Sequence, residues 1–234
     1  VFGAPVEPAM AAKLREAAAD VGETGDEIDH VVAVLAEIAP ADPADLGDLR
    51  VATAWLDRAD PLVRERVEAA ATRFGTRRPV DLPEPKGTYR LFEYEVARVH
   101  EGLFPEHEES YGEDVREKLV DCFEVTERQA DASARTRDLY RERCLELLEP
   151  FDLLVTPTLA LVAPRIGRIG NDERGLLTQF TYPFDVLGWP ALALPCGAAE
   201  DGLPASVQII GRPGEDALVL AAGASLERGT PDPL

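Results

Sequence analysis

The spacing of apolar residues changes along the chain, and each change marks a different element. Near the start, apolar positions recur every three to four residues over 8–21 and again over 27–38. This period is typical of an amphipathic helix, because it places the apolar side chains on one face. We therefore expect residues 1–48 to form an N-terminal helical segment and residues 49–234 to form one α/β region.

The α/β region opens with a strand–helix–strand pattern. Residues 49–55 and 78–83 have the character of strands, and apolar positions with helical spacing lie between them. Asp60 and Pro61 predict the start of that helix, with a capping carboxylate followed by proline at the first helical position. A helix that links two strands in so short a stretch predicts a parallel pair with a right-handed crossover.

A long acidic stretch, residues 91–149, has helical spacing over most of its length. Thr126 followed by Gln129 is the pattern of a capping box, which marks the start of a helix. The many charges of this stretch are most simply the solvated faces of its helices.

Residues 151–211 carry few charges, and glycine and proline interrupt them repeatedly. Three apolar runs, at 151–156, 191–194 and 206–210, are typical of buried strands. We expect this stretch to form the sheet core of an α/β domain, followed by a last helix over 216–227.

Composition narrows the functional classes. The chain has 24 Lys and Arg against 44 Asp and Glu, a formal net charge of −20, so direct binding to nucleic-acid phosphates is not expected. It has no apolar run as long as a membrane span. Its three cysteines are widely spaced, which argues against a disulfide framework and favours a reducing, cytoplasmic location. No dinucleotide or phosphate-binding glycine motif is present, and no cofactor is expected.

Few side chains are candidates for catalysis or metal binding. Cys196 ends an apolar run, and we favour a small buried hydrophobe over a nucleophile there. His100 and His107 lack the i, i+4 spacing that places two metal ligands on one helical face, so no metal site is expected. None of the serines has the glycine-rich turn that exposes a nucleophile. These serines are Ser110, Ser133, Ser206 and Ser225.

Three sequence blocks are distinguished by the positions of their proline and glycine residues: Phe151–Thr158, Phe180–Gly197 and Gly202–Gly211. In order and spacing they resemble the blocks D-L-L-V-T-P-T, F-x-P-x-N-x-x-G-x-P-A-x-x-L-P-x-G and G-L-P-x-x-x-Q of the amidase signature family. The likeness extends from about residue 49 to residue 227. It implies an α/β fold with a mixed sheet flanked by helices, like the C-terminal half of that family's fold.

The resemblance also implies hydrolysis of amide carbon–nitrogen bonds. In this family a lysine deprotonates one serine, which activates a second, nucleophilic serine, and a glycine-rich loop supplies the oxyanion donors. These residues belong to a G-G-S-S-G-G-S stretch and a lysine upstream of it, which have no counterpart here. The chain also begins at Val1 rather than Met. We therefore expect the C-terminal portion of an amidase, without a catalytic residue of its own and inactive alone.

The resemblance implies five residues that contact the substrate, a small-molecule amide. Asp185 stands where the family usually has asparagine, so a carboxylate replaces a neutral amide. We expect it either to repel an anionic substrate or to suit a cationic one. The five residues are Thr156, Thr158, Thr181, Asp185 and Trp189.

Two alternatives stay open. One is the A-type subunit of a tRNA-dependent amidotransferase, which shares the fold. The other is a non-catalytic protein that keeps the amidase scaffold. Whether the chain forms a homodimer is also left open by the sequence.

Overall fold

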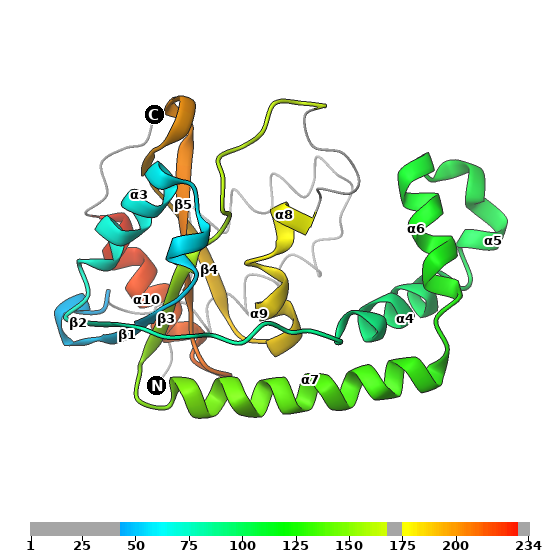
Figure 1. Cartoon of the computed structure of the whole chain (residues 1–234), viewed down its shortest axis with the longest axis horizontal. Coiled ribbons are helices and arrows are strands. Elements are labelled where there is room, and N and C mark those ends of the chain that lie inside the picture. Colours follow the sequence, from blue (N-terminus) through cyan, green and yellow to red (C-terminus); the bar gives the residue numbers. More distant parts are fainter. Residues whose placement is uncertain (1–42, 168–174, 229–234) are drawn as a thin grey trace, which may run out of the picture.

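A five-stranded mixed sheet forms the body of the protein (Figure 1). The structure is a computed structural model that describes residues 43–167 and 175–228. The strands lie in the order β2-β1-β3-β5-β4; the first three are parallel, and β5 is antiparallel to both of its neighbours. This confirms the predicted α/β fold with a mixed sheet. The strands are β1 Arg50–Thr53, β2 Thr76–Pro79, β3 Leu153–Pro157, β4 Ala191–Ala198 and β5 Pro204–Ile210.

The helices flank this sheet and extend away from it. The helices predicted over 8–21 and 27–38 lie outside the described residues. Within the described residues the α-helices are α3 Pro61–Ala71, α4 Tyr89–His100, α5 Phe104–His107, α6 Glu113–Phe123, α7 Glu127–Leu148, α8 Gly175–Thr178, α9 Tyr182–Leu187 and α10 Asp216–Glu227.

The first strand–helix–strand unit forms with two differences from the prediction, one at the helix cap and one in the position of β2. Helix α3 begins at Pro61 and β1 and β2 are parallel, as predicted, but the Asp60 carboxylate makes no capping hydrogen bond, so the fixed φ of Pro61 marks the helix start. Strand β2 occupies 76–79 rather than the predicted 78–83, because its pairing partner β1 has only four residues and the ladder ends at the pair Thr53 and Pro79. Leu82 is buried, as its apolar character predicts, but it lies beyond the ladder.

Side chains alternate between the two faces of the sheet, and each face has its own core. Val51 and Leu153 belong to the core beneath α3 and α10, whereas Ala52 and Leu154, their neighbours in sequence, belong to the core beneath α7 and α9. This period of two is the geometry of a strand with both faces covered.

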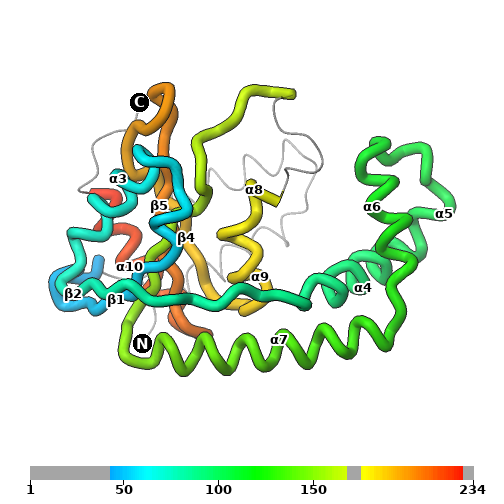
Figure 2. The backbone as a smooth tube through the Cα atoms, in the orientation of Figure 1, coloured from blue at the N-terminus to red at the C-terminus, as the bar shows by residue number. Residues whose placement is uncertain are grey.

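The acidic stretch forms an arm that leaves the sheet and returns to it. Helices α4 and α6 pack together at one end of the molecule, and α7 runs from there back to the sheet (Figure 2). Thr126 caps α7 by accepting a hydrogen bond from the Gln129 amide, and the Gln129 side chain accepts one in return from the Thr126 amide. The predicted capping box is confirmed.

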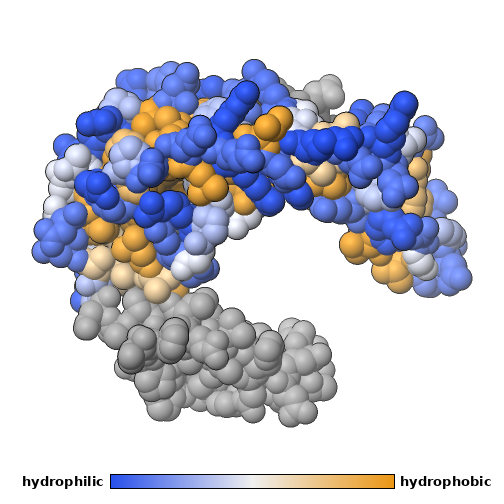
Figure 3. Space-filling view, turned by 90° about the horizontal axis from the view of Figure 1, so that it is seen from below, coloured by the Kyte–Doolittle hydropathy of each residue, from blue (hydrophilic) through white to orange (hydrophobic). Residues whose placement is uncertain are grey.

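Body and arm together form an arch in the space-filling view (Figure 3). Apolar side chains lie on the body and at the edge of the arm that faces the hollow of the arch. Phe92 and Phe123, on the arm, are 48% and 40% exposed. Such exposed apolar surface is typical of a face that another protein segment covers.

Candidate substrate site

The parallel strands β1 and β3 end at the same edge of the sheet, where α/β proteins commonly build sites. Thr156 is the last residue but one of β3 and is completely buried. Thr158 follows the strand and is half-buried; its hydroxyl lies 3.0 Å from the Ser206 hydroxyl. The prediction that Thr156 and Thr158 lie at a strand end is confirmed.

One residue outside the predicted set joins the three sequence blocks. Gln208, on β5, is 4% exposed and pairs with Thr156 of β3 across the antiparallel ladder. Its side-chain Nε2 donates to the Thr156 hydroxyl at 3.2 Å and to the Phe180 carbonyl at 3.1 Å. The sequence carried a signal for it, because a lone amide in an otherwise apolar strand needs hydrogen-bond partners.

The structure does not gather the five predicted residues into one cluster. Trp189 is 7% exposed and belongs to the core beneath α7 and α9. Thr181 is half-buried and immediately precedes α9. Asp185 is exposed on α9, which ends at Gly188 in the left-handed region with a φ of 67°. Burial by its neighbours still raises the pKa of the Asp185 carboxyl above its usual value.

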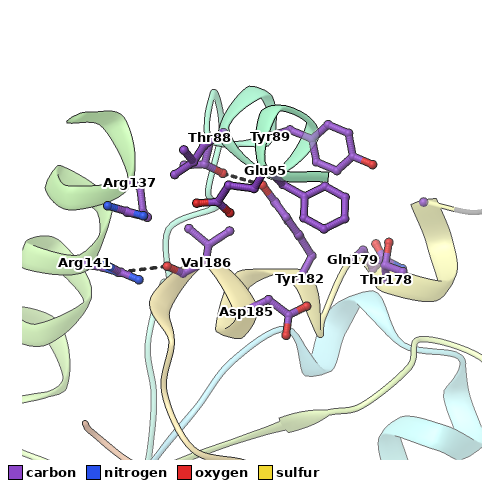
Figure 4. A pocket seen from close by; sticks show the side chains of 13 residues that line it. Thr88, Tyr89, Glu95, Arg137, Arg141, Thr178, Gln179, Tyr182, Asp185 and Val186 are labelled. Carbon is purple, nitrogen blue, oxygen red and sulfur yellow. Dashed lines mark hydrogen bonds between the residues drawn. The ribbon is translucent and has the colours of Figure 1, made fainter. Parts of the chain in front are cut away.

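Of the five predicted residues, only Asp185 lines the main cavity in the part of the chain that the structure describes (Figure 4). The cavity has a volume of about 650 Å³. Its walls come from three parts of the chain that are distant in sequence, namely 88–95 on and before α4, 137–141 on α7 and 175–186 on α8 and α9.

Aromatic rings form one side of this cavity. The ring of Tyr89 lies 5.5 Å from that of Phe92 and 5.5 Å from that of Tyr182, between ring centroids. The Tyr182 hydroxyl lies 2.9 Å from the hydroxyl of Thr88, which is itself buried. Burial raises the pKa of the Tyr182 phenol.

Four charged side chains also line the cavity, two acidic and two basic. On α7, Arg141 donates from Nε to the Val186 carbonyl at 3.0 Å, and Arg137 donates from Nε to Asp138 at 3.2 Å. The carboxylates are those of Glu95 and Asp185. These charges give the cavity both polar and apolar walls, as in a typical small-molecule site.

The other candidate side chains have local explanations. Burial raises the pKa of the Cys196 thiol to about 11, so the group is a neutral thiol at pH 7 rather than a reactive thiolate. His100 is engaged through Nδ1 with the Tyr111 hydroxyl at 3.0 Å. Among the described residues, no group of three or more His, Cys, Asp or Glu side chains is placed to hold a metal ion. In the same residues, every helix is too short or too polar to span a bilayer.

Comparisons with known proteins show which family has the three sequence blocks joined by Gln208. Residues 108–220 match the family model Amidase. The A-type subunit of the glutamyl-tRNA(Gln) amidotransferase of Moorella thermoacetica is 39% identical over 98 residues, which are 41% of this chain and 20% of that protein. The 6-aminohexanoate-cyclic-dimer hydrolase of Pseudomonas sp. is 38% identical over 95 residues, which are 35% of this chain and 19% of that protein.

Comparison of the fold also points to amidases, and the similarity covers more of the chain than the family model does. A crystal structure of an amidase is similar with a TM-score of 0.70 and 29% sequence identity, and the match covers 88% of this chain and 51% of that one. The chain therefore spans about half the length of that amidase. Matching blocks and a matching sheet together lead to one conclusion: residues 108–220 are part of a domain of the amidase signature family.

Proposed function

We propose that this chain forms the sheet and one wall of the substrate site in an enzyme that hydrolyses the carbon–nitrogen bond of a small-molecule amide. One observation carries the proposal: Gln208 binds Thr156 and Phe180, so three blocks of the family pattern meet at one buried side chain. A buried amide with its partners in place fixes the positions of the elements it joins.

We infer that the nucleophile comes from sequence beyond these 234 residues. A serine nucleophile needs a base within reach. Here Ser133 donates to the Gly87 carbonyl at 2.6 Å and Ser225 to the Ala44 carbonyl at 2.6 Å, while Ser206 lies against Thr158 and the Leu194 carbonyl. These contacts support structural roles for the three serines, and Ser110 lies exposed in a 3-10 turn.

The five sequence-predicted residues divide into two roles in this proposal. Thr158, Thr181 and Asp185 are accessible and are the proposed contacts with substrate. Thr156 and Trp189 are buried, so we assign them to positioning the strand end and α9. A cytoplasmic enzyme is the setting we propose, and the three free cysteines support it.

The test compares the 234-residue chain with the product of the complete reading frame that encodes it. Both are incubated with a panel of aryl and alkyl amides and with a fluorophosphonate, which labels activated serines. We expect no turnover and no label on the 234-residue chain. The complete product should hydrolyse amides and be labelled at a serine outside these residues.

Two results would overturn the proposal. Turnover by the 234-residue chain that is lost in Ser206→Ala, or in the equivalent variant of another of the four serines, would place the nucleophile here. A complete product that is unlabelled and inactive would instead support a non-catalytic protein that keeps the scaffold.

A second function has a specific observation behind it, the 39% identity to the A-type component of a tRNA-dependent amidotransferase. In that role, the complete product would release ammonia for a partner instead of hydrolysing free amides. Amide-dependent amidation of a charged tRNA, seen only when partner proteins are added, would favour this function over the first.

A further inference from the structure

The main cavity combines an aromatic wall with a carboxylate that lacks a counter-ion in the described residues. Tyr182 and Asp185 are three residues apart on α9, so both side chains leave the helix on the same side. Tyr89 and Phe92, with the same spacing on α4, complete the ring cluster. The rings and the carboxylate therefore face one space.

The basic residues of the cavity come from α7, and the one that reaches α9, Arg141, binds the Val186 carbonyl rather than the Asp185 carboxylate. In Figure 4, Arg137 and Arg141 extend from α7 on one side, and the Glu95 carboxylate lies toward them. Asp185 projects away from that side, beneath Tyr182. No hydrogen bond or ion pair joins its carboxylate to another group within residues 43–167 and 175–228, whereas Arg137 and Arg141 are both already engaged.

We propose that this cavity binds an organic ammonium ion with an apolar or aromatic body, whose charge lies at Asp185 and whose body lies against Tyr182, Tyr89 and Phe92. A cation beside an aromatic face is attracted by the ring quadrupole, and the effect grows as water is excluded. The unpaired carboxylate adds a charge-assisted hydrogen bond to the ammonium group. The inference rests on the proposed function, because Asp185 is one of the substrate contacts proposed there, and it names the substrate class as amides that carry a positive charge.

An anionic ligand is the alternative that the charges argue against. It would have to approach two carboxylates, Glu95 and Asp185, and both arginines already have partners: Arg137 donates to Asp138 and Arg141 to the Val186 carbonyl. A neutral ligand would bury the Asp185 carboxylate without a partner, which is costly.

The test measures binding to the 234-residue chain, so it needs no turnover. Three probes of similar shape are compared by calorimetry and saturation-transfer NMR: 3-phenylpropylammonium, 3-phenylpropanol and 3-phenylpropionate. We expect the ammonium probe to bind about tenfold more tightly than the alcohol, with the carboxylate weakest, because a charge-assisted contact is about twice as strong as a neutral one. Equal binding of the three, or tighter binding of the carboxylate, would overturn the inference.

Substitution of Asp185 then tests whether its carboxylate is the group that binds the ammonium ion. Asp185→Asn keeps the size of the side chain, and we expect it to remove most of the ammonium preference while the affinity for the alcohol, which makes only a hydrogen bond there, changes much less. Asp131→Asn is the matched control, because Asp131 is an exposed carboxylate of α7 outside the cavity wall. An Asp185→Asn variant that binds the ammonium probe as tightly as wild type overturns the inference. If that variant does not fold, the ranking of the probes on wild type decides.

The outcome is separable from that of the proposed function. If the chain binds the ammonium probe selectively but the complete reading-frame product is inactive, the proposed binding site stands and the proposed hydrolase function is refuted. If the complete product hydrolyses amides but the chain does not prefer the ammonium probe, only the inference about the ammonium ligand is refuted.

Discussion

Gln208 is the residue on which the junction of the three sequence blocks depends. Its Nε2 group reaches two partners, Thr156 and Phe180, inside the core. We expect Gln208→Leu, which is close in volume, to lower the free energy of unfolding by about 1–3 kcal/mol, because a buried carbonyl loses its donor. Equilibrium urea denaturation measures the change.

The matched control for this variant is Gln179→Leu. Gln179 donates to the Leu176 carbonyl at 3.4 Å in an exposed setting, so its replacement should change the free energy of unfolding by less than about 0.5 kcal/mol. Equal effects of the two substitutions would mean that the Gln208 contacts do not hold the blocks together.

At this scale, sequence reasoning located single residues but not the cavity. The position of Thr156 at a strand end follows from Pro157, because proline has no amide hydrogen for further pairing. Tyr89, Phe92 and Tyr182 were missed, since each is an ordinary aromatic residue until α4 and α9 are brought together. The i, i+3 spacing of Tyr89 with Phe92 marks a helix face but does not say what that face meets.

Among the helices, α7 depends most clearly on its first turn. Thr126 caps a helix of 22 residues that carries the arm and one wall of the cavity. We expect Thr126→Ala to cost about 1 kcal/mol, because amides of the first turn lose their acceptor. Thr136→Ala is the control on the same helix; its hydroxyl only donates to the Ala132 carbonyl, so a smaller effect is expected. Thermal and urea unfolding of both variants are compared, and equal losses would contradict a capping role.

Elements with local signals were predictable, and those set by pairing were less so. The start of α3 at Pro61 and the capping box of α7 both follow from neighbouring residues. Strand β2 lies earlier in the chain than predicted. The apolar positions up to Leu82 indicate only which side chains are buried, whereas the end of the strand is set by the length of its partner β1. The antiparallel course of β5 had no local signal, because strand direction depends on residues far away in sequence.

On the scale of the whole molecule, the two edges of the sheet differ. Strand β2 exposes Arg77 and Arg78 and ends in proline, which are the usual protections of an edge against pairing with another chain. Strand β4 is twice as long, with eight residues against four, and it exposes Ala191, Ala193 and Pro195 without a charge. Its outer edge pairs with no strand of the described residues. Pro195 and the register irregularity after it limit pairing at one end of β4, so the unprotected part of this edge is Ala191–Leu194.

We therefore expect the 234-residue chain to associate with itself through β4, which also bears on whether it forms a homodimer. Ala193→Lys should shift the population toward monomer in sedimentation velocity runs over a range of concentrations, because a charge on the edge opposes pairing. Thr76→Lys, on the exposed β2 edge, is the control and should change nothing. Both variants reduce the net charge of −20 by the same amount, and weaker repulsion alone would promote association. Dissociation by Ala193→Lys alone therefore identifies the edge as the contact, whereas equal behaviour of the two variants would assign the association to another surface.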